Sequence, residues 1–103
     1  MSKKINVGII GGGYISQICY IPFLLKNKHC YLKCISDERL SIREYLYKRY
    51  DKYKVKVYNN YEDIILHSKL DLIFIIAPRK TNSYIAEQCL MAGKNIFMEK
   101  PIS

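Results

Sequence analysis

Three consecutive glycines are the residues of this sequence best suited to hold a phosphate group. An apolar run from Ile5 to Ile10 ends in Gly11, Gly12 and Gly13, and an apolar-periodic segment follows. Gly11 would allow a sharp turn, and the bare backbone at Gly13 would let a pyrophosphate approach closely. The free N–H groups and positive dipole end of the following helix would then face that pyrophosphate. The spacing predicts a dinucleotide-binding turn made by Gly11, Gly13, Tyr14 and Ile15.

Ser16 occupies the position where this fingerprint requires a third small residue, at the contact of helix and strand. Serine is small enough to pack there, although glycine or alanine is usual. Because a glycine motif alone is weak evidence, a plain strand-to-helix turn without a ligand stays an alternative.

Asp37 follows the apolar run Cys30–Ile35 and lies about 20 residues beyond the glycine motif, where an acidic residue meets the adenosine ribose. A carboxylate there accepts hydrogen bonds from the ribose hydroxyls and repels a 2′-phosphate, which favours NAD. Arg39 could pair with that phosphate, so NADP stays possible. The alternative for Asp37 is a carboxylate that stabilises the next helix. The capping box from Ser41 to Glu44 would start that helix independently.

Length and composition indicate one small domain over residues 1–103, half hydrophobic and a quarter charged, as in a soluble globular protein. We find no apolar run long enough for a membrane and no signal peptide, so we expect a cytoplasmic location. The four cysteines lack metal-site spacing, and no metal is expected.

A net charge of +8 raises the question of a nucleic-acid partner. Tyrosines and basic residues interleave between Tyr45 and Lys54, a pattern compatible with base stacking. We favour an amphipathic helix with its tyrosines toward the core, and therefore expect no nucleic-acid partner.

Five strand-like segments alternate with helical ones along the chain. The strands are expected at residues 5–10, 30–35, 55–58, 71–77 and 95–98. Four helices are expected. The first runs from Gly13 toward Asn27, and the second from the Ser41 capping box to about Asp51. The third is short and is capped by the Asn60 side chain, and the fourth runs from Thr81 to Ala92. Pro22 must kink or split the first helix. In the last helix we expect Ile85, Cys89 and Leu90 to point inward and Gly93 to form the C-terminal cap.

This alternation predicts an α/β fold, a Rossmann-type doubly wound parallel sheet with strand order 3-2-1-4-5. The glycine turn, Asp37, the pair Ala77–Pro78 and the segment Glu99–Pro101 would all lie at the carboxyl edge. Their convergence at the point where the strand order reverses predicts a ligand crevice there.

Four segments carry a family resemblance: Val7–Gly13, Val57–Tyr58 with Tyr61–Asp63, Asp71–Pro78 and Ala92–Pro101. With them the chain resembles the N-terminal domain of the Gfo/Idh/MocA oxidoreductases. The resemblance implies that Lys100 is catalytic beside the nicotinamide, where an ammonium could also stabilise a developing alkoxide. It further implies cofactor contacts from Ala77, Pro78, Asn82, Glu99 and Lys100. Ala77 and Asn82 depart from the threonine and histidine usual in the family.

The resemblance implies the cofactor-binding domain of an NAD(P)-dependent oxidoreductase acting on a sugar, cyclitol or polyol. The alternatives are a stand-alone dinucleotide-binding or redox-sensing module and an inactive fragment. Family members carry a second domain for the substrate, which we expect to be absent here, so that the chain alone would be inactive. An uncovered sheet edge would then favour self-association.

Overall fold

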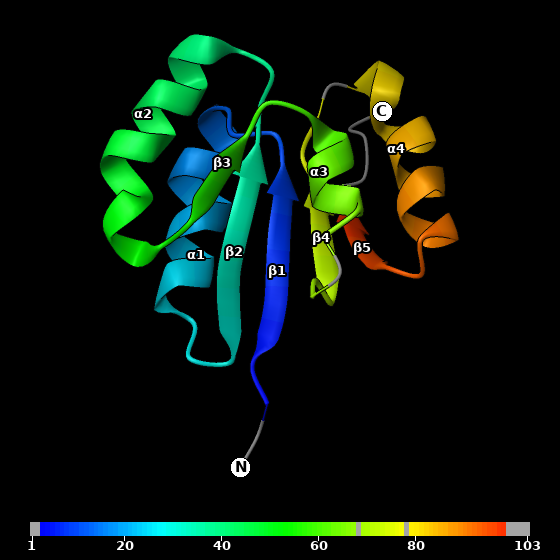
Figure 1. The fold of residues 1–103 in the computed structure, drawn as a ribbon, viewed down its shortest axis with the longest axis horizontal. Helices are drawn as coiled ribbons and strands as arrows, with labels where there is room; N and C mark the ends of the chain where they lie inside the picture. Colours follow the sequence, from blue (N-terminus) through cyan, green and yellow to red (C-terminus); the bar gives the residue numbers. More distant parts are fainter. Residues whose placement is uncertain (1–2, 68, 78, 99–103) are drawn as a thin grey trace.

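The computed structural model describes residues 3–67, 69–77 and 79–98 as a parallel sheet with helices on both faces (Figure 1). Its order is β3-β2-β1-β4-β5, which confirms the predicted topology. The strands are β1 (Ile5–Ile10), β2 (Cys30–Ser36), β3 (Lys56–Tyr58), β4 (Leu72–Ile75) and β5 (Asn95–Met98). The helical segments are η1 (Ser16–Tyr20), α1 (Ile21–Lys26), α2 (Leu40–Tyr50), η2 (Asp51–Tyr53), α3 (Tyr61–Ile65) and α4 (Arg79–Met91).

The carboxyl ends of the strands are level with one another. Ile10 at the end of β1 pairs with Ser36 on one side and Ile75 on the other. The outer pairs, Ser36 with Tyr58 and Ile75 with Met98, continue this row across the sheet. Every loop that leaves a strand therefore starts from one edge.

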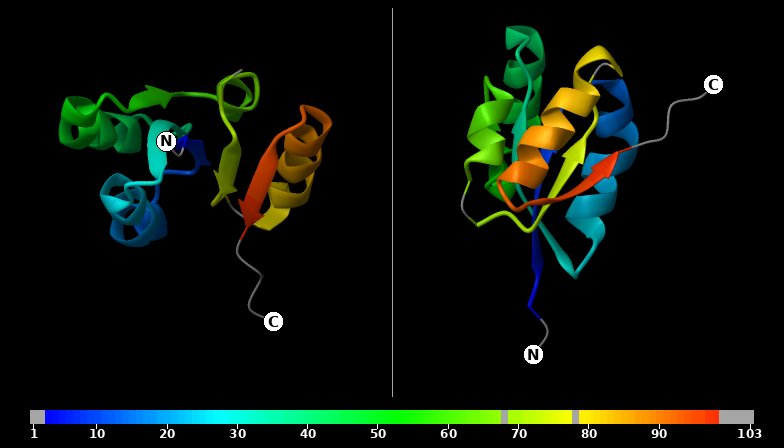
Figure 2. Two further views of the ribbon diagram at one scale, coloured as in Figure 1. Left: turned by 90° about the horizontal axis from the view of Figure 1, so that it is seen from below. Right: turned by 90° about the vertical axis from the view of Figure 1, so that its right-hand side faces the viewer.

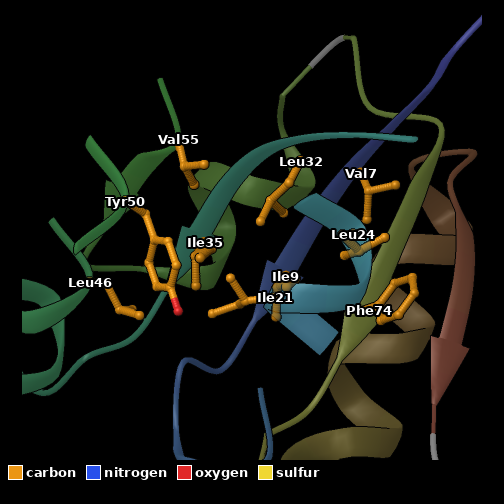
Figure 3. Packing of buried hydrophobic residues seen from close by; sticks show 10 residues of the cluster. All are labelled: Val7, Ile9, Ile21, Leu24, Leu32, Ile35, Leu46, Tyr50, Val55 and Phe74. Carbon is orange, nitrogen blue, oxygen red and sulfur yellow. The ribbon is translucent and has the colours of Figure 1, made fainter. Parts of the chain in front are cut away.

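Two hydrophobic clusters lie on the two faces of the sheet. Helices α1 and α2 cover one face and α3 and α4 the other, as the view along the sheet shows (Figure 2). On the α1–α2 face, Val7 and Ile9 of β1 pack with Ile21, Leu24 and Leu46 (Figure 3). On the opposite face Ile10, Ile64, Ile73, Ile85 and Cys89 pack together. Burial on both faces explains why the central strands are nearly uninterrupted apolar runs.

The first helix is divided into two segments near Pro22, as the sequence predicted. Its middle part, η1, is a π-helix, and Pro22 lies in the first turn of α1, where its missing N–H costs little. The wider turn changes the direction of the apolar residues. Ser16 and Ile21 are fully buried, whereas Phe23 is 56% exposed. Uniform helical spacing could not anticipate this change.

Three expectations about the other helices are wrong. Helix α2 begins at Leu40 with Arg39 as its N-cap, so the Ser41 capping box does not start it. Asn60 precedes α3, but its side chain makes no capping hydrogen bond. Leu90 is 60% exposed, because the buried stripe of α4 ends with Cys89. Gly93 does adopt a positive φ of 77° after α4, as expected of a C-terminal cap.

The tyrosines around α2 also differ from their prediction. Only Tyr50 among the four is buried, at 5% exposure, and the other three project into solvent: Tyr45, Tyr47 and Tyr53. Lys52 and Arg49 lie over tyrosine rings there.

Among the described residues, no helix is long and apolar enough to cross a membrane.

Candidate functional site

A groove of about 730 Å³ lies at the carboxyl edge, where β1 separates the two halves of the sheet. Residues from the first strand turn, the end of β2, the loop before α3 and the start of α4 line it. The predicted site residues that line it are Gly11, Gly13, Tyr14, Ile15, Asp37, Arg39 and Ala77. The fold therefore gathers most of the predicted site around one groove of a size ordinary for small ligands.

Gly11 forms the sharp turn with a φ of +108°, a conformation that side chains other than glycine rarely adopt. Its N–H donates to the carbonyl of Ser36 at 2.8 Å, which joins the turn to β2. A Cβ at Gly11 would lie 2.5 Å from the carbonyl oxygen of Ile76. This glycine therefore lets the β1 turn and the end of β4 meet.

Contacts made by Gly12 and Ser16 fix the position of the glycine turn. A Cβ at Gly12 would lie 2.5 Å from Leu46 Cδ1, so this glycine allows α2 to approach. The Ser16 hydroxyl donates to the Gly11 carbonyl at 2.6 Å, and the Gln17 amide donates to the Gly12 carbonyl at 2.8 Å. Ser16 is thus the small buried residue that the motif predicts. Both side chains satisfy carbonyls of the turn.

Gly13 is the most open of the three glycines. The atom nearest to a Cβ built there is Arg39 Nη2, at 3.2 Å, the end of a long side chain. The backbone here is accessible from the groove, at the start of a helical segment whose first N–H groups lack intrahelical partners. Among the described residues, Arg39 is the one side chain within 4 Å of this Cβ position, where an anionic group could bind.

Asp37 is a buried acidic residue beside the glycine turn. Its side chain is 5% exposed, and its Oδ2 accepts the N–H of Gly12 at 3.0 Å. Burial would raise the pKa of this carboxyl, but hydrogen bonds from Arg39 and Gly12, together with the charge of Arg39, bring the pKa below its ordinary value. Asp37 is therefore ionised at neutral pH and holds the glycine turn in place.

Two arginines surround Asp37. Arg39 contacts both carboxylate oxygens, and its own side chain is 59% exposed. Arg43 donates to the carbonyls of Asp37 and Glu38 and to Asn59 Oδ1. Arg43 therefore joins the loop after β2 to the loop after β3.

The other half of the groove is more apolar. Ile76, Ala77 and Ile85 form its wall, together with Thr81 at the start of α4. Asn82 does not line the groove. Its Oδ1 is buried and has no hydrogen-bond partner among the described residues. Pro78, Glu99 and Lys100 lie outside the described residues.

Several groove residues escaped the sequence prediction. They are Ser36, Glu38, Asn59, Asn60, Tyr61, Glu62 and Thr81. They lie at the end of β2, in the segments after β2 and β3, and in the first turns of α3 and α4, so nearness to the carboxyl end of a strand was the available signal. Gly12 and Arg43 act through tertiary contacts that the sequence does not reveal.

Cys34 and Cys89 are buried free cysteines. Burial raises the pKa of the Cys34 thiol to about 12 and that of Cys89 to about 11, so both thiols are protonated at neutral pH. Within the described ranges, no cluster of three His, Cys, Asp or Glu residues could hold a metal ion.

The features of the groove fit a dinucleotide. The open Gly13 backbone offers room for a pyrophosphate, and the ionised carboxylate of Asp37 lies beside it, where a dinucleotide places its adenosine ribose. The apolar wall at Ile76 and Ile85 suits a flat ring.

Comparison with known proteins gives relatives over nearly the whole chain. The uncharacterized oxidoreductase YrbE of Bacillus subtilis is 31% identical over 105 residues, covering 100% of this chain and 29% of that protein. The scyllo-inositol dehydrogenase of Lactobacillus casei, solved with NAD(H) and scyllo-inositol, has a TM-score of 0.82 at 28% identity. That match covers 96% of this chain and 28% of the dehydrogenase.

A 3-ketoreductase of Actinomadura kijaniata, KijD10, solved with TDP-benzene and NADP, has a TM-score of 0.84 at 19% identity over 98% of this chain and 31% of its own. This likeness shows the shared fold. The chain spans less than a third of the length of these proteins. The model of the Gfo/Idh/MocA family, an oxidoreductase family with an NAD-binding Rossmann fold, matches residues 5–103, and the chain therefore belongs to this family.

Proposed function

We propose that this chain is the cofactor-binding domain of an NAD(P)-dependent dehydrogenase that acts on a sugar, cyclitol or polyol. The observation that carries the proposal is the glycine turn, open at Gly13 and tied through Gly12 to the buried Asp37. The inositol dehydrogenase among its relatives supports the class of substrate. We call the part of the groove around Gly13, Asp37 and Arg39 the adenosine half. The part around Ile76, Ala77 and Thr81 is the nicotinamide half.

Each residue then has a physical role. The backbone at Gly13, Tyr14 and Ile15 would hold the pyrophosphate, and Asp37 would orient the adenosine ribose. Ala77 would line the nicotinamide half. Asn82, whose cofactor contact the resemblance implies, lies outside the groove lining, and its buried Oδ1 has no hydrogen-bond partner among the described residues. The cofactor supplies a hydride acceptor or donor when bound. Lys100 would stabilise an alkoxide on the substrate as the hydride leaves.

We propose NAD rather than NADP as the preferred cofactor, because a buried, ionised carboxylate repels a 2′-phosphate. The inositol dehydrogenase was solved with NAD(H), which supports this choice. Neighbouring Arg39 would reduce the preference.

The substitution Gly13→Val tests the proposal. The Cβ of the new side chain would have only the end of Arg39 within 4 Å among the described residues, so we expect the variant to fold and still exclude the pyrophosphate. We expect NADH binding, measured by fluorescence titration, to weaken at least about 100-fold, the loss of about 3 kcal/mol of contacts. Ala92→Val adds similar bulk at an exposed position on the opposite edge and should leave binding unchanged. Equal NADH affinity in Gly13→Val and the parent chain, with both folded by circular dichroism, would refute the proposed function.

Self-association and a cytoplasmic location stay predictions. Strand β5 ends the sheet with Phe97 and Met98 39% and 38% exposed, and it carries no charged residue. Such an apolar edge favours pairing with another chain. Sedimentation velocity should reveal a dimer, and a monomer at all concentrations would contradict the prediction.

A further inference from the structure

The carboxylate of Asp37 is fully occupied in this structure. Its Oδ1 accepts the backbone N–H and the Nε–H of Arg39, both at 2.9 Å. Its Oδ2 accepts the N–H of Gly12 at 3.0 Å and Nη2 of Arg39 at 2.8 Å. A carboxylate has about four acceptor positions, so these four bonds use all of them.

A ribose at this position needs two of the same acceptor positions for its two hydroxyls. The bonds from the two backbone N–H groups hold the loop and the glycine turn, so they cannot be released without moving the backbone. The bonds from the Arg39 side chain can be released, since that side chain is 59% exposed. Within the described residues, its guanidinium bonds only to Asp37.

The guanidinium also blocks the space beside the glycine turn. Its Nη2 lies 3.2 Å from the point where a Cβ of Gly13 would be, on the open side of that residue. Two N–H donors of Arg39 therefore occupy the places where two ribose O–H donors would bind.

We propose that Arg39 is a displaceable latch on the adenosine half and sets the balance between the two dinucleotides. This inference rests on the proposed function. To bind NAD, Asp37 exchanges the two side-chain donors of Arg39 for two hydroxyl donors, and the guanidinium turns out into solvent. To bind NADP, Arg39 keeps its place near Asp37 and pairs with the 2′-phosphate, an interaction that suits its planar fork of donors. The latch thus opposes NAD and supports NADP.

The substitution Arg39→Ala separates these effects. Removing the competing Arg39 side chain, which is itself 59% exposed, should tighten NAD binding about two- to five-fold. Losing a charge-assisted phosphate contact should weaken NADP binding about ten-fold or more. Arg49→Ala is the matched control, because this substitution removes the same charge from the other end of α2. The control should leave the ratio of the two dissociation constants within about two-fold, since distant exposed charges are screened.

Calorimetric titration of the parent chain and both variants with NAD and with NADP, at matched ionic strength, gives these constants. If NAD binds more weakly to Arg39→Ala, or the ratio does not change, the latch is refuted while the proposed function stands. If neither dinucleotide binds the parent chain, both are refuted.

Nuclear magnetic resonance of the unmodified chain provides a second measurement that does not depend on the folding of a variant. In the free chain the Nε–H of Arg39 should exchange slowly with water, because Asp37 accepts it. Saturating NAD should move this resonance to that of a free arginine, and NADP should leave it protected. Protection unchanged by NAD would overturn the latch.

Discussion

The two halves of the groove differ in how they are held together. In the adenosine half, the glycine turn, Asp37 and the arginines form one network of hydrogen bonds. In the nicotinamide half, apolar residues such as Ile76 and Ile85 form a wall. The adenosine half is thus preorganised by contacts within the described chain. The nicotinamide half provides shape, and its expected chemistry depends on Lys100.

Gly11 joins the two halves, and its substitution should have the largest effect. Gly11→Ala forces a side chain into a φ of +108° and places a Cβ 2.5 Å from the Ile76 carbonyl. We expect a loss of at least about 1–3 kcal/mol of unfolding free energy from the backbone conformation alone. Each kcal/mol should lower the melting temperature by about 4–8 °C in a domain of this size.

Gly13→Ala is the control for this change, because its Cβ would meet only the end of Arg39. Thermal unfolding followed by circular dichroism measures both variants. If Gly11→Ala has the same melting temperature as the parent chain, the conformation of Gly11 is not what holds the β1 turn against the end of β4.

Asp37→Asn should have an intermediate effect that depends on pH. The pKa of Asp37 is lower in the folded chain than its ordinary value of 3.8, so its ionised form stabilises the fold above that pH. This stabilisation is lost as the pH falls through the folded-state pKa, because the carboxyl is then protonated. We expect Asp37→Asn to cost about 1–3 kcal/mol at neutral pH.

The difference between Asp37→Asn and the parent chain should shrink as the pH falls below about 4, near the ordinary pKa of an aspartate. Urea unfolding of both proteins from pH 7 to pH 3 measures it. A difference that is constant over this range would show that the network does not depend on the charge of Asp37.

The sequence could predict the features that depend on local signals, but not those that depend on tertiary contacts. The strand order and the glycine turn follow from local signals: apolar runs, glycine spacing and strand ends. Three other features depend on how the helices pack on the sheet. They are the hydrogen bonds from Arg39 to the Asp37 carboxylate, the close approach of Leu46 to Gly12, and the π-helix η1. The Ser41 capping box is a local signal that failed, because α2 begins earlier, at Leu40.

Lys100 should have the smallest effect on cofactor affinity, although we propose that it is catalytic. By the family resemblance it belongs to the nicotinamide half, and the adenosine half already supplies the contacts that hold a dinucleotide. Lys100→Met removes the charge and keeps the length of the side chain. We expect the dissociation constant for NADH to stay within a few-fold of the parent value, because the lost interaction forms chiefly in the transition state.

The matched control is Lys80→Met, which removes the same charge from an exposed position in the first turn of α4. In a form of the protein that includes the substrate-binding domain, Lys100→Met should lower turnover about 10²–10³-fold, as the loss of one preorganised donor does. The control should keep full turnover, since Lys80 is placed outside the groove lining. Because the family resemblance places the acid–base groups in a second domain, we expect no turnover from residues 1–103 by themselves, with or without Lys100. Full turnover in Lys100→Met, or a loss of NADH affinity as large as that of Gly13→Val, would move Lys100 out of the catalytic role. Steady-state kinetics and fluorescence titration, measured on the same preparations, distinguish these two results.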